Sequence, residues 1–206
     1  QAFRFASPRY KNWDDTRATD LLGQFELPPD RIIKKLSKGM RVKAALVVAL
    51  AHGPQVLVLD EPMSGLDPLM RDDLIETLLS ARAENTECII LSSHQIDDVN
   101  RLADEVAIIN AGKLLVHSSI DDLLGTTKRV EAVLLDGRMP ERPLPQTVWQ
   151  NVDRRNWSMT VHPFDETMLE ALQADNPISS ARIIDLSVEQ IFKDMIRGAT
   201  PPCFAH

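Results

Sequence analysis

The stretch that decides the fold is Val56-Leu57-Val58-Leu59-Asp60-Glu61-Pro62, an unbroken apolar run that ends in two adjacent acids. Such a run is typical of a strand that is buried on both faces of a sheet. In a doubly wound sheet, ligands bind at the carboxyl ends of the strands, where Asp60 and Glu61 stand. One acid there can hold a metal ion while the other accepts a proton from an attacking water. Taken alone, the stretch also fits a strand that simply ends in solvated acids.

Strands and amphipathic helices alternate on both sides of this stretch. Because such alternation indicates a parallel sheet, we predict an α/β fold with a largely parallel sheet and a helical subdomain. A tight turn at 110–112 leads into a hairpin. The predicted helices are at about 14–25, 39–51, 69–83 and 96–103, and the further strands at 88–91, 106–109 and 113–116.

The pattern changes after Gly125, where short strands surround a loop that is rich in proline. We predict an α/β domain over 1–125, a small α+β accessory domain over 126–198 and a flexible tail over 199–206. The accessory strands are expected at 130–135, 147–152, 158–161 and 181–186, and its helices at 165–173 and about 187–197.

Composition excludes several classes of function. The 206 residues carry 23 basic and 30 acidic side chains, a net charge of −7, which argues against nucleic acid as a partner. The longest apolar run, 44–51, is far shorter than the roughly 20 residues that cross a membrane. Cys88 and Cys203 show neither a metal-ligand spacing nor a disulfide framework, which suits a reducing cytosol.

Three further motifs flank the two acids. Leu36-Ser37-Lys38-Gly39-Met40 leads into a helix whose free amides and dipole could bind phosphate, although the motif alone also fits a plain N-cap. Ser64-Gly65-Leu66-Asp67-Pro68 fits a turn in which Asp67 caps the next helix. Leu91-Ser92-Ser93-His94 places a histidine at the carboxyl end of another apolar strand.

The order of these motifs resembles the nucleotide-binding subunit of ATP-binding cassette (ABC) proteins. The resemblance is close over residues 30–125, and the helix at 14–25 fits the helical subdomain of that family. It implies the C-terminal part of a P-loop NTPase-type ABC ATPase domain. The segment 186–192, Leu-Ser-Val-Glu-Gln-Ile-Phe, also resembles the end of subunits that serve ABC-2-type exporters.

The resemblance implies a role for each acid and for the histidine. Asp60 matches the Walker B aspartate that is associated with Mg²⁺. Glu61 matches the catalytic glutamate that polarises or deprotonates the attacking water, and His94 matches the switch histidine that reaches the γ-phosphate. Asp67 matches the D-loop aspartate that couples two protomers. These roles agree with what phosphoryl transfer needs.

The resemblance also implies that the signature motif contributes to the nucleotide site. Ser37 and Gly39 match the positions that contact the γ-phosphate of ATP bound mainly by the opposite protomer. Lys38 and Met40 stand where glycine and glutamine are commonest in the family, but they lie beside those positions. The whole predicted nucleotide-contacting motif is Leu36, Ser37, Lys38, Gly39 and Met40.

The phosphate-cradling Walker A motif GxxxxGK[ST] does not occur in the 206 residues. Family members carry it N-terminal to the signature, and this sequence starts at Gln1 on an apolar stretch. We therefore expect an N-terminally truncated chain that is inactive alone.

The predicted function is an ATP-binding and hydrolysing subunit that works as a homodimer or heterodimer and drives export through a separate membrane permease. The permease would dock around residues 10–35. We expect a cytoplasmic protein that meets the inner face of the membrane only through the permease. The alternatives are a non-transport ABC ATPase and a non-catalytic regulatory fragment. Ser64-Gly65-Leu66-Asp67 favours transport, since ribosome-acting members commonly carry an Asn-His pair there.

Overall fold

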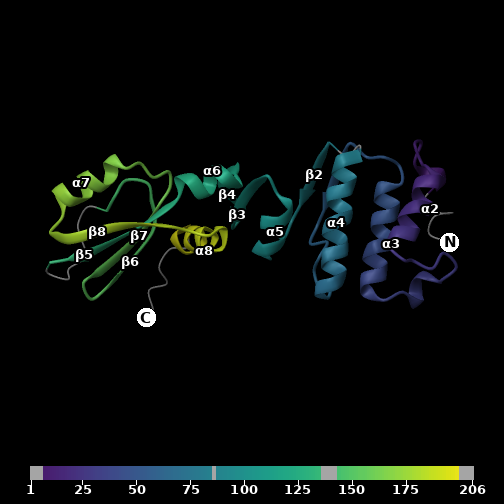
Figure 1. Cartoon of the computed structure of the whole chain (residues 1–206), viewed down its shortest axis with the longest axis horizontal. Helices are drawn as coiled ribbons and strands as arrows, with labels where there is room; N and C mark the ends of the chain where they lie inside the picture. Colours follow the sequence, from purple (N-terminus) through teal and green to yellow (C-terminus); the bar gives the residue numbers. More distant parts are fainter. Residues whose placement is uncertain (1–6, 85–86, 136–142, 200–206) are drawn as a thin grey trace. The chain divides into compact units, whose positions relative to one another are not determined.

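The computed structural model describes residues 7–84, 87–135 and 143–199, and it forms two compact units (Figure 1). Unit 1 is Gln1–Leu102 and unit 2 is Ala103–His206. The sequence analysis placed a boundary at 125 instead. Residues 103–125 join unit 2 because Leu123 and Ile108 pack in one apolar cluster with Ile191, near the end of the chain.

The described residues of unit 1 form helices and one two-stranded sheet, β1–β2 (Figure 1). Strands β1 and β2 run parallel, with Val56 opposite Cys88 and Leu59 opposite Leu91. The elements in chain order are η1 (Ser7–Arg9), α2 (Asp15–Gln24), η2 (Ile33–Lys35), α3 (Lys38–Leu50), β1 (Val56–Leu59), α4 (Pro68–Glu84), β2 (Cys88–Leu91) and α5 (Ile96–Leu102).

The helices of unit 1 begin where the sequence predicts them. Asp14 caps α2 by accepting a hydrogen bond from the amide of Arg17, and Ser37 caps α3 in the same way. Helix α4 buries Leu74 and Leu78, whereas Leu79 is 42% exposed. The buried residues of α2, α3 and α4 form the apolar core of the unit.

Strand β1 is buried on one face only, so the prediction of burial on both faces was wrong. Leu57 is 5% exposed, whereas Val56 is 56% and Val58 is 68% exposed. Ile90, which lies opposite Val58 on β2, is 55% exposed as well. The described helices of unit 1 bury Leu57 within the core, and no described element of the unit buries the face that carries Val58.

Unit 2 contains two antiparallel sheets and three helices among its described residues. Its elements are β3 (Glu105–Asn110), β4 (Lys113–Ser119), α6 (Ile120–Thr126), β5 (Lys128–Leu134), β6 (Thr147–Asp153), β7 (Asn156–Val161), α7 (Thr167–Asp175), β8 (Ile178–Asp185) and α8 (Val188–Ala199).

The first sheet of unit 2 is the hairpin β3–β4, whose turn places Ala111 and Gly112 at φ of +48° and +74°. The second sheet has the strand order β6-β7-β5-β8. Both sheets are antiparallel. Within the described residues, parallel pairing is therefore limited to β1–β2, and the expected largely parallel sheet is seen only as that pair.

The strands and helices predicted after residue 125 are present, with ends that differ by a few residues. Ser187 caps α8 by accepting from the amide of Gln190, and its own amide donates to Gln190 Oε1, which completes a capping box. Helix α6 was not predicted, although Ser119 caps it. The predicted flexible tail lies, apart from Ala199, outside the described residues, as does Pro140 of the proline-rich loop.

A buried ion pair ties α8 to the second sheet of unit 2. The guanidinium of Arg129 on β5 donates to the carboxylate of Asp194 on α8. The Thr160 hydroxyl on β7 donates to the same carboxylate oxygen over 2.6 Å. Asp194 and Thr160 are buried, and the Arg129 side chain also stacks over the Trp149 ring at 5.2 Å.

His162 gives unit 2 a predictable pH dependence. Its Nδ1 lies 3.0 Å from the hydroxyl of buried Thr127, and burial lowers the pKa of His162 below the ordinary value of 6.5. Between the lowered pKa and 6.5 the folded chain therefore binds fewer protons than the unfolded chain. We expect the urea midpoint of unit 2 to fall as the pH is lowered through this window, and His162→Gln to flatten that fall.

The matched control is His117→Gln, because His117 is 57% exposed beside Glu105. This variant should keep the pH slope that is due to His162. Urea unfolding at a series of pH values measures all three slopes. Equal slopes for the parent chain and His162→Gln would show that His162 does not cause the effect.

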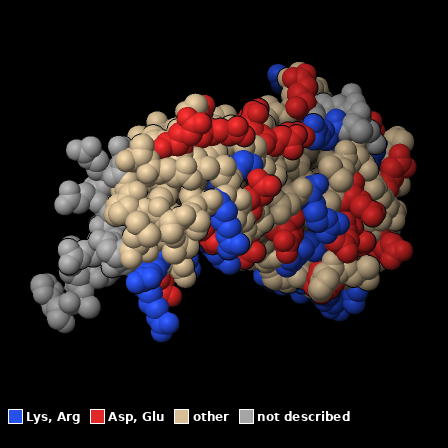
Figure 2. Space-filling view, turned by 60° about the vertical axis from the view of Figure 1, so that its left-hand side comes forward, with Lys and Arg blue, Asp and Glu red and all other residues tan. Residues whose placement is uncertain are grey.

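Acidic and basic side chains are interspersed on the face that Figure 2 shows, and lysine and arginine do not gather there into one broad patch. Among the described residues, none of the helices combines the length and the apolar composition needed to cross a membrane.

Candidate functional site

The parallel pairing of β1 and β2 brings two of the sequence motifs to one edge. Because Leu59 and Leu91 are paired at the carboxyl ends of the strands, Asp60 and Ser92 leave the sheet side by side. The amide of Ser92 donates to the carbonyl of Leu59 over 2.9 Å, which extends the pairing by one residue. The sequence predicts that ligands bind at this edge. The two acids that follow β1 meet the Ser-Ser-His stretch that follows β2 there.

Ser92 links the two acids. Its hydroxyl donates to Asp60 Oδ1 over 2.7 Å and accepts from the backbone amide of Glu61 over 2.8 Å. Since a hydroxyl has one hydrogen and two lone pairs, it can make both bonds at once. The sequence analysis gave Ser92 no role, because only the register of the β1–β2 pair places it beside Asp60.

Glu61 has an unusual backbone conformation at this edge. Its φ is +46°, in the left-handed region that residues other than glycine rarely occupy. The amide of Ser64 donates to the Glu61 carbonyl over 3.1 Å, so a tight turn follows directly. Backbone strain of this kind is concentrated at functional sites, where the surroundings hold it in place.

His94 contacts the carboxylate of Glu61. Its Nδ1 lies 2.8 Å from Glu61 Oε2, and the two side chains are 65% and 38% exposed. A carboxylate can only accept, so Nδ1 carries the hydrogen in this pair. The structure thus brings together Asp60, Glu61 and His94, the three residues that the sequence placed at strand ends.

The carboxylate of Asp60 fits the way in which proteins usually bind a magnesium ion. Mg²⁺ commonly takes one or two carboxylates and completes its shell with water and substrate phosphates. Asp60 supplies such a carboxylate, which Ser92 orients. Within the described ranges, no group of three His, Cys, Asp or Glu side chains is placed to hold a metal ion by itself.

The Leu36–Met40 motif forms the start of α3. The Ser37 hydroxyl accepts from the amide of Met40 over 3.2 Å, and its carbonyl accepts from the amide of Arg41 over 3.0 Å. Leu36 and Gly39 are buried. A Cβ on Gly39 would lie 2.1 Å from the sulfur of Met70 on α4, so glycine allows this close packing.

The loop that carries Asp67 lies beside that motif. Asp67 caps α4 by accepting from the amide of Met70 over 3.0 Å, as predicted. Gly65 has φ of +69°, and a Cβ there would lie 2.2 Å from the Lys38 ammonium nitrogen. The structure therefore places Lys38 and Asp67 on one side of unit 1, while no hydrogen bond among its described residues joins them to Asp60, Glu61 or His94.

The cap at Ser37 gives a test that needs no ligand. We expect Ser37→Ala to lower the free energy of unfolding of unit 1 by about 1 kcal/mol, because one helix amide loses its acceptor. Ser80→Ala is the matched control, since the Ser80 hydroxyl only donates to the carbonyl of Glu76 within α4. Urea unfolding followed by circular dichroism measures both. Equal stability of the two variants would contradict the capping role.

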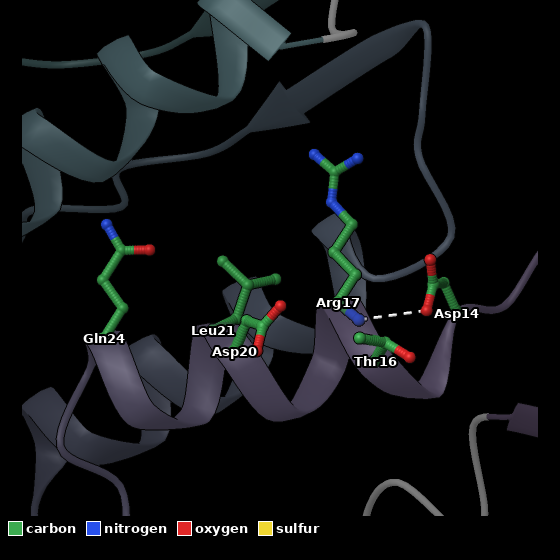
Figure 3. A pocket seen from close by; sticks show the side chains of 6 residues that line it. All are labelled: Asp14, Thr16, Arg17, Asp20, Leu21 and Gln24. Carbon is green, nitrogen blue, oxygen red and sulfur yellow. Dashed lines mark hydrogen bonds between the residues drawn. The ribbon is translucent and has the colours of Figure 1, made fainter.

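A separate hollow of about 200 Å³ lies along α2 and is shown in Figure 3. Its lining includes Asp14 and Arg17, whose amide donates to the Asp14 carboxylate over 3.0 Å. None of the residues that the sequence assigned to the nucleotide site lines this hollow, although its lining lies within residues 10–35, where the sequence analysis expects the permease to dock. The strand edge is therefore the candidate site.

Comparison with known proteins adds independent information on unit 1. Residues 12–97 match a family whose description reads "AAA domain, putative AbiEii toxin, Type IV TA system". An ABC transporter ATP-binding protein of Synechocystis sp. is 40% identical over 105 residues, which are 51% of this chain and 29% of that protein. Another, of Methanocaldococcus jannaschii, is 34% identical over 113 residues, 55% of this chain and 42% of that protein.

Over about half of its length, this chain matches the ATP-binding proteins of ABC transporters. A solved structure described as an ATP-binding subunit of an ABC transporter agrees, with 28% identity, a TM-score of 0.53, and coverage of 59% of this chain and 52% of the other. The coarse expectation of an α/β fold of the ABC ATPase type is confirmed over that part.

A longer but weaker match extends into unit 2. An energy-coupling factor transporter ATP-binding protein of Clostridium perfringens is 27% identical over 168 residues, 78% of this chain and 56% of that protein. The chain thus spans less than two thirds of the length of each of these curated ABC relatives.

Proposed function

We propose that this chain belongs to an ATP-hydrolysing subunit of an ABC transporter, in which the edge formed by β1 and β2 is the hydrolytic site. The observation that carries the proposal is the contact of Asp60, Glu61, Ser92 and His94 at one strand edge. The match of residues 12–97 to the AAA-domain family supports it, and so does the match of about half of the chain to an ABC transporter ATP-binding protein.

In this proposal each residue of the edge has one task. Asp60 would hold Mg²⁺, and the ion would supply positive charge that neutralises the phosphates. Glu61 accepts a proton from the water that attacks the γ-phosphate. His94 donates from Nε2 to a γ-phosphate oxygen. Because its Nδ1 hydrogen is held by Glu61, this donation requires an imidazole that carries both hydrogens.

The motif at the start of α3 completes a second site in a dimer. Ser37 and Gly39, within Leu36–Met40, face the nucleotide of the opposite ATPase subunit, and Asp67 couples the two subunits. The 206 residues contain no GxxxxGK[ST] motif. We propose that the cradle for the β- and γ-phosphates lies in polypeptide outside them, and we expect no saturable MgATP binding by the 206 residues alone at millimolar nucleotide.

We propose export through a separate membrane permease, which the residues around 10–35 contact. Export is the direction that the segment 186–192 indicates. The subunit would lie on the cytoplasmic face of the membrane and would reach the membrane only through the permease.

The experiment that tests the function uses a C-terminal affinity tag on the protein in its source cells. The tagged assembly is purified in detergent and assayed for MgATP hydrolysis. We expect hydrolysis that falls at least tenfold with His94→Ala and is unchanged with His117→Ala, and a co-purified protein with several membrane spans. Hydrolysis that does not respond to His94→Ala would overturn the site.

The nature of the co-purified proteins separates the proposed transporter from other ABC ATPases. A multi-span protein present in stoichiometric amount supports transport. Ribosomal proteins or DNA in place of a permease, with hydrolysis still dependent on His94, would keep the ATPase and replace transport with a non-transport function.

A further inference from the structure

Helices α4 and α5 are joined by two arginine–aspartate pairs of opposite character. Arg71 on α4 lies 3.8 Å from Asp98 on α5, and these side chains are 25% and 2% exposed. Arg101 on α5 lies 2.5 Å from Asp72 on α4, and these are 48% and 52% exposed. The first pair is buried and loose, while the second is exposed and close.

The buried pair is costly for the fold. One oxygen of Asp98 and the Nε of Arg71 are buried without a hydrogen-bond partner. Burial raises the pKa of Asp98 above its ordinary value, even though Arg71 and Arg101 act in the opposite direction. A buried charge pair that leaves polar atoms unpaired is weak as a source of stability, so its presence calls for another explanation.

Arg71 also reaches the loop that carries His94. Its guanidinium donates to the side-chain oxygen of Gln95, the residue next to His94. Gln95 is further held by Ser93, whose hydroxyl accepts from the Gln95 amide over 3.0 Å. The loop between β2 and α5 is thus fixed from α4 through one side chain.

The other end of this connection is Asp67. The amide of Arg71 donates to the Asp67 carbonyl over 3.0 Å, and Asp67 caps the same first turn of α4. A displacement of Asp67 therefore moves the backbone of Arg71, and through the guanidinium it moves Gln95. Because Gln95 follows His94 directly in the chain, the displacement also reaches His94 and its contact with Glu61.

We propose that Arg71 is a positioning residue that connects the Asp67 loop to His94 through Gln95. The inference rests on the proposed function, in which His94 donates to the γ-phosphate. Arg71 adjusts the position from which His94 does so. Arg71 touches neither nucleotide nor attacking water in this scheme. It sets where His94 lies relative to Glu61 and makes that position depend on the Asp67 loop.

The first test uses amide hydrogen exchange of the 206-residue chain. We expect Arg71→Met to accelerate exchange of the amides at 93–97 about tenfold, because Gln95 loses its link to α4. Arg101→Met, which removes the exposed pair between the same two helices, should change those rates less than twofold. Unchanged exchange at 93–97 in Arg71→Met would overturn the proposed link.

Gln95→Ala is the second variant, since it removes the same link without leaving Asp98 unpaired. It keeps the proposal testable if Arg71→Met does not fold. We expect it to reproduce the faster exchange at 93–97 with an unchanged urea midpoint. Slow exchange in this variant would contradict the role of Gln95.

The second test is a double-mutant cycle in the purified ATP-hydrolysing assembly. We expect Arg71→Met to lower kcat about tenfold with the KM for MgATP within twofold of the parent, and to have no further effect on kcat in the His94→Ala background. A merely structural role would lower kcat equally in both backgrounds, and that result would overturn the inference while leaving the proposed function intact. Failure of His94→Ala alone to lower kcat would instead reject the proposed function.

Discussion

Replacement of Glu61 by glutamine is expected to lower MgATP turnover about 10²–10⁴-fold in the ATP-hydrolysing assembly, the range that a general base contributes. Glutamine keeps the size of the side chain and can still contact His94, but it cannot accept the proton of the attacking water. The hydrogen bond from residue 61 to Ser92 uses the backbone amide, so the variant keeps it. MgATP binding should therefore stay within about twofold.

Glu87→Gln is the matched control for this substitution. Glu87 is an exposed glutamate in the same unit that directly precedes β2, whereas the candidate site lies at the carboxyl end of that strand. Its replacement should leave turnover unchanged. Single-turnover hydrolysis together with equilibrium nucleotide binding measures both variants. Normal turnover in Glu61→Gln would remove Glu61 from the role of base.

Removal of Asp194 is expected to destabilise unit 2 by about 3–5 kcal/mol, because the Arg129 guanidinium then stays buried without its counter-charge. Buried Thr160 loses its acceptor in the same variant. The exposed side chain of Asp185, which pairs with Lys128 over 2.7 Å, provides the control. Asp185→Ala should cost between about 0 and 1 kcal/mol.

Urea unfolding followed by tryptophan fluorescence measures this difference in a Trp13→Phe background, where the remaining tryptophans, Trp149 and Trp157, both lie in unit 2. The double variant Arg129→Met with Asp194→Leu should recover most of the lost stability, since it removes both charges together. Equal losses in Asp194→Ala and Asp185→Ala would show that burial of the pair does not decide its contribution.

Local sequence signals predicted the elements of this chain well. Asp14, Ser37 and Ser187 each place a helix start, because a cap needs only residues within one turn. The turn at Ala111 and Gly112 is decided equally locally. The α/β character of unit 1 followed from the alternation of such elements.

Long-range features could not be predicted in the same way. The exposure of Val58 depends on which elements cover a face of the strand pair, and the four apolar residues of β1 do not by themselves specify those elements. The link from Arg71 to Gln95 joins residues 24 positions apart, and their side chains become neighbours only once α4 and α5 pack. Helix α6 was missed because its cap, Ser119, ends a strand without a break.

In the candidate site, too, some features could be predicted from the sequence and others could not. Asp60, Glu61 and His94 were recognisable from their positions at strand ends, because strand ends meet at one edge in a parallel pair. Ser92 was not recognised, since its importance arises from the register that sets it opposite Asp60. Which residues meet at the strand edge was thus predictable, whereas what orients them was not.

The hydrogen bonds of Ser92 allow residue 61 to change independently of Asp60. Its hydroxyl holds the side chain of Asp60 but only the main chain of residue 61, and every residue except proline offers that amide. The glutamate can therefore be exchanged without disturbing the support of the aspartate. In the proposed ATPase, a single-codon change at position 61 would leave a site that still engages its nucleotide and no longer turns it over, so an unequal pair of such sites would lie one mutation away from an equal pair.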